Sequence, residues 1–162
     1  NGLADENKKE ESESDSALSG VRFLCAEDNE MNAVILEANL KWRGASCRIF
    51  PDGTSLVEHF AVADPGEYDM ILMDVQMPMM NGYEAARAIR KSSNPDGKTI
   101  PIIAMTANAF SDDIRACLSA GMDAHVAKPV DVAVFEKIVR SLREDKKCLV
   151  QRCKTDCSRI II

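Results

Sequence analysis

The chain has 162 residues, the size of one domain, and 46% of them are hydrophobic, which is enough to form a core. Its formal net charge of −6 and pI near 5.0 argue against nucleic acid as a direct partner, because phosphate backbones bind basic surfaces. No apolar run approaches the roughly 18 residues of a transmembrane helix, and no leader has the pattern of a signal peptide. We therefore expect a cytoplasmic chain without direct membrane contact.

The composition changes at both ends of the chain. Residues 1–19 are rich in serine and acidic residues and contain few apolar ones, so we predict an acidic disordered linker. Residues 20–144 form the predicted domain. Residues 145–162 are a basic tail beyond the last predicted helix, and its three cysteines fall short of a four-ligand zinc site. The start at Asn1 suggests a segment of a longer parent, and whether that parent is membrane-anchored stays open.

Five short apolar segments alternate with helical patterns along the domain. The predicted strands are residues 21–26, 46–50, 70–74, 100–106 and 123–127. The predicted helices cover about 31–42, with Met31, Val34, Ile35, Ala38, Leu40 and Trp42 at helical spacing, then 53–61, 83–90, 111–120 and 132–142. Because helical crossovers make consecutive strands parallel, the sequence predicts an α/β fold with a five-stranded parallel sheet and helices on both faces.

Two of the predicted strands end in carboxylates. The strand 70–74 closes with Asp74, after which Pro78 prevents a central strand and Asn81-Gly82 offers the positive φ of a turn. The first strand is followed directly by Glu27-Asp28. Parallel neighbours lie about 4.8 Å apart and share one edge of the sheet, so we expect the three carboxylates to converge.

Such a cluster predicts a magnesium site. Neighbouring carboxylates repel one another, and Mg²⁺ is a hard ion that uses one or two carboxylates together with phosphate oxygens. Asp74 would then act as a carboxylate nucleophile that attacks phosphorus to form an acyl phosphate. Two further polar residues close later strands, Thr106 with a hydroxyl donor and Lys128 with a positive charge. Metal and lysine would neutralise the charge that phosphorylation adds.

At this point the motifs resemble a known family, the receiver domain of two-component response regulators. The resemblance covers about residues 21–142 and rests on Glu27-Asp28-Asn29, Asp74, Met77-Pro78 with Asn81-Gly82, Thr106-Ala107 and Lys128-Pro129. The segments 26–32 and 105–110 are similar to receivers fused to the end of hybrid sensor histidine kinases. The resemblance implies the flavodoxin-like receiver fold with strand order 2-1-3-4-5.

The resemblance also implies roles for individual residues. Asp74 would take phosphate from a histidine kinase or histidine phosphotransfer domain, and the domain would catalyse its own phosphorylation and dephosphorylation without being a stand-alone turnover enzyme. Implied magnesium ligands are Asp28, Asp74 and the main-chain carbonyl of Gln76, with Glu27 acting through water. Thr106, Ala107 and Lys128 would bind the phosphoryl group.

Further implied features concern the conformational switch. The bond between Lys128 and Pro129 would be cis, and Thr106 would move toward the phosphate. His125 stands where the family usually has Tyr or Phe, and it is read either as a packed ring or as a pH-sensitive switch. Output, and dimerisation where it occurs, would use the face formed by the fourth helix, fifth strand and fifth helix.

Three other classes of protein are alternatives. A receiver-like adaptor that never carries phosphate would be supported by the loss of a motif residue, and none is lost. A phosphatase with an aspartate nucleophile needs a second aspartate as general acid at the position of Gln76, which cannot donate a proton in that way. A flavodoxin-like redox carrier needs a serine- and threonine-rich phosphate loop after the first strand, which the sequence lacks.

Overall fold

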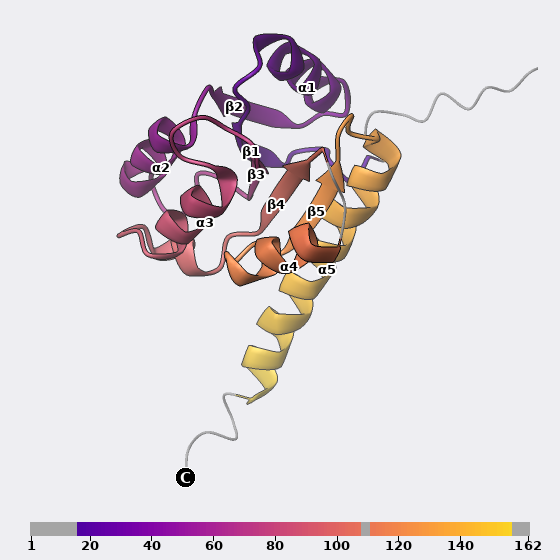
Figure 1. Cartoon of the computed structure of the whole chain (residues 1–162). Helices are drawn as coiled ribbons and strands as arrows, with labels where there is room; N and C mark the ends of the chain where they lie inside the picture. Colours follow the sequence, from indigo (N-terminus) through magenta and orange to yellow (C-terminus); the bar gives the residue numbers. More distant parts are fainter. Residues whose placement is uncertain (1–15, 108–110, 157–162) are drawn as a thin grey trace, which may run out of the picture.

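The centre of the molecule is a parallel sheet with the strand order β2-β1-β3-β4-β5 (Figure 1). The computed structural model describes residues 16–107 and 111–156. Its strands are β1 (Arg22–Ala26), β2 (Ser46–Phe50), β3 (Met70–Asp74), β4 (Ile102–Thr106) and β5 (Ala124–Ala127). The predicted α/β class, the five-stranded parallel sheet and its order are confirmed.

Helices cover both faces of this sheet (Figure 1). They are α1 (Glu30–Trp42), α2 (Gly53–Val62), α3 (Gly82–Arg90), the short 3₁₀ helix η2 (Pro95–Lys98), α4 (Ser111–Ser119) and α5 (Val132–Asp156). Side chains of α1 and α5 form one core with the sheet, whereas α2, α3 and α4 form the other. All five residues of β3 and of β4 are buried, which explains why these segments are apolar without alternation.

Local signals set the ends of several helices. The side chains of Asn29, Asp52 and Asn81 each accept a hydrogen bond from a first-turn amide and so cap α1, α2 and α3. Gly44 and Gly121 have positive φ values of 82° and 90° just beyond α1 and α4, the left-handed conformation in which glycine commonly ends a helix.

Two predicted bounds differ from the structure by two residues or more. Strand β4 begins at Ile102 rather than Ile100 because Pro101 has no amide hydrogen for the ladder. The last helix does not stop before residue 145, since α5 continues to Asp156 without a glycine or proline to end it. Residues 157–162, the rest of the predicted tail, lie outside the described part.

Leu18 belongs to the core although it was predicted to lie in the linker. Its side chain is fully buried among residues of α1, α5 and the sheet. The neighbouring Ser16 hydroxyl donates a 2.7 Å hydrogen bond to Glu136 of α5, and the Gly20 amide donates to the Gly44 carbonyl at 2.9 Å. The packed core therefore reaches back before the predicted boundary at residue 20, while residues 1–15 lie outside the described part.

Helix α1 departs most from the predicted apolar face. Only Leu36 and Leu40 of this helix are buried, whereas Met31, Val34 and Trp42 are 64% to 74% exposed. Apolar residues occur on both sides of the helix, and the sheet can cover only one of them.

Among the described residues, no helix is both long and apolar enough to cross a membrane.

Candidate functional site

The predicted site residues come together at the carboxyl edge of the sheet. Glu27 and Asp28 follow β1, Asp74 ends β3, Thr106 ends β4 and Lys128 follows β5. Ligand oxygens of Glu27, Asp28 and Asp74 all lie within 4.8 Å of one another. The register explains this convergence, because β1 and β3 are direct neighbours in which Ala26 pairs with Met73. The predicted cluster of three carboxylates is therefore confirmed.

Lys128 joins two of these carboxylates. Its Nζ donates to Asp74 Oδ2 at 2.9 Å and to Glu27 Oε2 at 2.7 Å. The Glu27 and Asp74 side chains are only 2% and 5% exposed, while that of Lys128 is 23% exposed. Two buried carboxylates thus share one ammonium group, so the three ionised groups carry a net charge of −1. The pair between Lys128 and Glu27 was not predicted from the sequence, because it joins segments about a hundred residues apart.

Burial dominates the electrostatics of Asp74. The pKa of this carboxyl is raised to about 6: loss of hydration raises it most, the hydrogen bond from Lys128 lowers it, and the Glu27 charge raises it. The Gln76 amide also donates to Asp74 Oδ1, at 3.1 Å. The two carboxylates in turn raise the pKa of Lys128, although burial acts in the opposite direction. The site therefore holds a carboxylate that is costly to ionise without a further cation.

The loop from β3 to α3 passes close beneath the site. Met79 has a left-handed φ of 68° and the Met80 amide donates to the Pro78 carbonyl at 2.9 Å, which makes a tight three-residue turn. The sequence had placed the positive φ at Asn81-Gly82, and this prediction was wrong. Gly82 is required for space instead, because a Cβ there would overlap the carbonyl of Asp74 and lie 2.8 Å from Val75 Cα.

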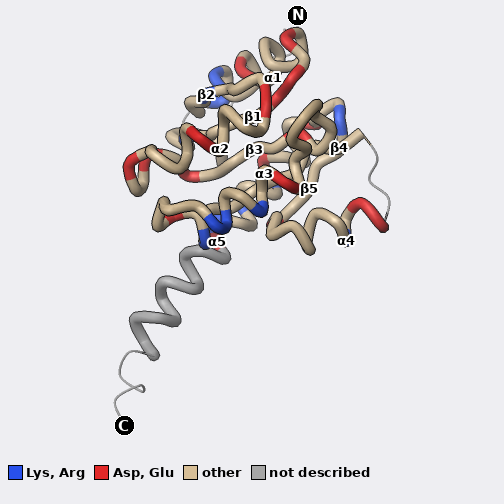
Figure 2. Tube along the Cα trace, turned by 60° about the vertical axis from the view of Figure 1, so that its left-hand side comes forward, with Lys and Arg blue, Asp and Glu red and all other residues tan. Residues whose placement is uncertain are grey.

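An open cavity of about 430 Å³ lies beside the strand end of Asp74. Its lining includes Gln76, Asn81 and Thr106, together with Asp113 from the acidic first turn of α4. That turn carries two neighbouring aspartates, and red marks the start of α4 in Figure 2. The cavity is an entry from solvent to the side of the site that Gln76 and Thr106 form.

The remaining predicted residues lie around this edge. Thr106 is 5% exposed, and its carbonyl accepts a 2.8 Å hydrogen bond from the Lys128 amide. The Lys128–Pro129 peptide bond is cis, as the resemblance implied. His125 is half-buried on β5 and pairs with Ala104, so it lies on the same face of the sheet as Thr106. Ala107 follows β4 and is exposed.

The donor set fits a hard divalent cation. Three carboxylates whose oxygens lie within 4.8 Å of one another offer only oxygen ligands, as Mg²⁺ prefers. Asp28 is exposed and the other two are buried, so a cation could enter from the Asp28 side. A bound cation would also neutralise the uncompensated charge beside Lys128.

One surface beside the site was missed from the sequence. Met31 and Val34 are exposed in the first turns of α1, which begins shortly after Glu27-Asp28, and Met79 is 99% exposed in the loop after β3. Trp42 is also exposed but lies at the other end of α1, away from the site. Exposed apolar side chains that recur on one helix face indicate an interaction surface. The signal was present in the sequence as a helix with more apolar residues than one face can hold.

Comparison with known proteins agrees with this geometry. Residues 23–140 match the family model of the response regulator receiver domain. The peroxide stress-activated histidine kinase mak1 of Schizosaccharomyces pombe is 35% identical over 127 residues, which are 78% of this chain but 8% of that kinase. The chain therefore spans less than a tenth of the length of this curated relative.

Solved structures of receiver domains are also similar. The receiver domain of sensor histidine kinase PA1611 from Pseudomonas aeruginosa PAO1, with a magnesium ion coordinated in its active site cleft, is 38% identical with a TM-score of 0.67, over 76% of this chain and 98% of that one. The receiver domain of Saccharomyces cerevisiae Ssk1, solved with the histidine phosphotransfer protein Ypd1, is 28% identical with a TM-score of 0.63, over 74% and 86%. With its family match, its sheet order and its edge of carboxylates, the chain belongs to the response regulator receiver domain family.

Proposed function

We propose that Asp74 accepts a phosphoryl group from a phosphohistidine and that the chain is the receiver part of a hybrid sensor histidine kinase. The observation that carries this proposal is the buried Asp74 carboxylate, held by Lys128 at 2.9 Å in a cluster whose oxygens suit a divalent cation. The similarity to the histidine kinase mak1 over 8% of its length supports a histidine kinase as the parent.

The reaction requires one bond to break and one to form. The phosphorus–nitrogen bond of phosphohistidine breaks, an Asp74 oxygen bonds to phosphorus, and the imidazole leaves with the electron pair and takes up a proton. Lys128 and the Gln76 amide hold the carboxylate in place before the reaction. Asp28, Asp74 and the Gln76 carbonyl would hold Mg²⁺, with Glu27 acting through water, and the ion would supply charge neutralisation at the transferred phosphoryl group.

Residues around the acceptor would then bind the new phosphoryl group. Thr106 would donate its hydroxyl, the Ala107 amide would lie nearby, and Lys128 would exchange a carboxylate for a phosphoryl oxygen. A shift of Thr106 would be followed by His125 on the neighbouring strand, with Pro129 fixing the backbone after Lys128. Output through α4, β5 and α5, including dimerisation there, is part of this proposal.

The partner would be a helical domain that carries the phosphohistidine. Met31 and Val34 are exposed in the first turns of α1, just after Glu27-Asp28, and Met79 is exposed in the loop that follows Asp74. A partner that covers these side chains would bring its histidine near Asp74. The solved complex of Ypd1 with the Ssk1 receiver supports a histidine phosphotransfer domain as one such partner. A histidine kinase domain of the parent is the other.

Intact mass after incubation with Mg²⁺ and acetyl phosphate tests the acceptor. We expect the wild type to gain one phosphoryl group, about 80 Da, and Asp74→Asn to gain none. A gain of mass in Asp74→Asn would show that another residue is the acceptor. If neither protein gains mass, beryllofluoride separates the remaining readings: a Mg²⁺-dependent complex in the wild type indicates a short-lived phosphoryl group, and its absence supports the adaptor.

A further inference from the structure

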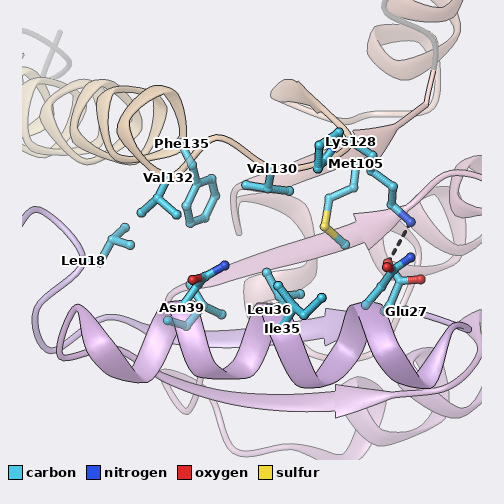
Figure 3. A pocket seen from close by; sticks show the side chains of 13 residues that line it. Leu18, Glu27, Ile35, Leu36, Asn39, Met105, Lys128, Val130, Val132 and Phe135 are labelled. Atoms are coloured by element: carbon cyan, nitrogen blue, oxygen red, sulfur yellow. Dashed lines mark hydrogen bonds and ion pairs between the residues drawn. The ribbon is translucent and has the colours of Figure 1, made fainter.

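A second cavity lies on the opposite side of the site from the entry beside Thr106. It has a volume of about 380 Å³ and runs between α1 and α5, with the end of the sheet as its floor (Figure 3). Roughly 150 Å³ suffices for benzene in an apolar protein cavity, so this one has room for a bicyclic ring system with a short chain. Its size also falls within the range of small-molecule sites in proteins, about 300 to 1,000 Å³.

The two ends of the cavity differ in chemistry. Figure 3 shows the apolar side chains of Leu18, Val132 and Phe135 at one end, with Leu36 nearer the middle, and Asn39 of α1 is a polar residue at that end. The other end is closed by the hydrogen-bonded pair of Glu27 and Lys128. An occupant would therefore need an apolar body and a polar head.

The charge at the polar end selects the head. The Glu27 side chain is 2% exposed and lines the cavity, and Lys128 divides its ammonium group between Glu27 and Asp74. The ion cluster keeps a net negative charge, and the Asn32 side chain beside it offers an amide oxygen as a further acceptor. A cationic head with N–H donors is favoured here, whereas an anionic head would meet the buried Glu27 carboxylate.

We propose that the cavity between α1 and α5 is a binding site for a small aromatic or branched aliphatic amine, whose body lies against Leu36, Val132 and Phe135 and whose ammonium group donates to Glu27. The site is separate from the phosphoryl acceptor but shares Glu27 and Lys128 with it. Binding at one site therefore changes affinity at the other by the same factor in both directions. The amine site on the unphosphorylated protein does not require the proposed function of Asp74.

Tryptamine is a suitable probe because it joins a bicyclic ring to a short ammonium chain, and indole-3-propionate is its anionic counterpart. Two-dimensional ¹H–¹⁵N NMR titration of the full 162-residue chain to about 10 mM probe reads binding in the millimolar range. We expect saturable shifts at the amides of α1 and of the start of α5. Because it loses a charge-assisted hydrogen bond, indole-3-propionate should bind more weakly than tryptamine by about tenfold or more.

A matched pair of variants separates the cavity from a surface effect. Val132→Phe fills the cavity, whereas Val134→Phe makes the same change on the same helix at a residue that is 47% exposed and lies outside the lining. We expect Val132→Phe to lower tryptamine affinity by about tenfold and Val134→Phe to leave it unchanged. An unchanged chemical-shift pattern outside α1 and α5 shows that both variants are folded.

Several results would overturn the proposal. These are the absence of saturable shifts with tryptamine, equal or tighter binding of indole-3-propionate, and equal affinity in Val132→Phe and Val134→Phe. Deletion of residues 1–15 gives a further such result. If the deletion shifts the same amides in the absence of any probe, the cavity is occupied by the chain's own N-terminal segment. Phosphorylation by acetyl phosphate in these samples is read separately, so its failure leaves the binding result intact.

Discussion

Lys128 Nζ lies 2.9 Å from Asp74 Oδ2, so the proposed acceptor and the cation that would follow the phosphoryl group are already hydrogen-bonded. The same ammonium group lies 2.7 Å from Glu27 Oε2, and both carboxylates are buried. Two buried carboxylates that depend on one cation make this site both reactive and a cost to the stability of the fold.

Replacing Lys128 by methionine should destabilise the protein in the absence of divalent cations. The change leaves two buried carboxylates without a counter-ion, so we expect the free energy of unfolding to fall by about 2 kcal/mol, and Mg²⁺ to restore part of the loss. Urea denaturation with and without Mg²⁺ measures both effects. The exposed Lys137→Met on α5 is the control, and equal stability of the two variants would refute the prediction.

The raised pKa of Asp74, about 6, predicts a pH dependence of stability. A carboxyl whose pKa is higher in the folded than in the unfolded state favours folding while it is protonated, and this contribution is lost as the pH rises through the folded pKa. In Mg²⁺-free buffer we expect wild-type stability to fall, relative to Asp74→Asn, by roughly 2 kcal/mol between about pH 4 and pH 7. Urea denaturation across this range tests it, and parallel curves for the two proteins would show that Asp74 titrates normally.

Substitution of Gly82 should damage the site through the backbone. A Cβ there would overlap the Asp74 carbonyl and lie 2.8 Å from Val75 Cα, so Gly82→Ala must push α3 away from β3. We expect a loss of about 2 kcal/mol or more in unfolding free energy, together with slower phosphorylation by acetyl phosphate. In Gly20→Ala a Cβ meets no atom within 4 Å and only the left-handed φ of 76° is strained. Its cost should be about 1 kcal/mol, with phosphorylation unchanged.

Arg90 should be a major contributor to stability away from the site. Its guanidinium donates hydrogen bonds of 2.7 to 3.0 Å to the carbonyls of Gly97, Ile100 and Gly121 and to the Asp123 carboxylate. It thereby fixes the end of α3 against the segments that lead into β4 and β5. We expect Arg90→Ala to lower the unfolding free energy by about 3 kcal/mol, since several carbonyls lose their donor. Arg87→Ala, exposed on the same helix, should change it by less than about 0.5 kcal/mol, as chemical denaturation will show.

The exposed apolar face of α1 should matter for the partner and not for the chemistry. Val34 is 64% exposed beside the site, so Val34→Glu places a charge on the proposed docking surface. We expect transfer from a phosphorylated histidine phosphotransfer domain to slow by about tenfold, while phosphorylation by acetyl phosphate is unchanged. Val62→Glu makes the same change on α2 at a residue that is 82% exposed. Equal transfer rates in the two variants would place the partner elsewhere.

Much of the site could be predicted from the sequence because each of its residues is identified by its immediate neighbours along the chain. Asp74 ends its apolar strand and Glu27-Asp28 directly follow theirs, and the rule that parallel strands share an edge brings these three carboxylates together. Helix ends were equally local, since Gly44 and Gly121 take the positive φ that their positions require. The charge cluster, and hence a divalent-cation site, needed no knowledge of side-chain packing.

The tertiary structure alone decided which surfaces are covered and which atoms meet across the chain. The sequence could not show that α1 turns Val34 and Trp42 to solvent, that Leu18 closes the core, or that Gly82 is needed for space. The pair between Lys128 and Glu27 and the cavity between α1 and α5 also depend on segments far apart in the sequence. Periodicity describes one element at a time, whereas burial, close approach and enclosed volume depend on the distance between elements, which packing sets.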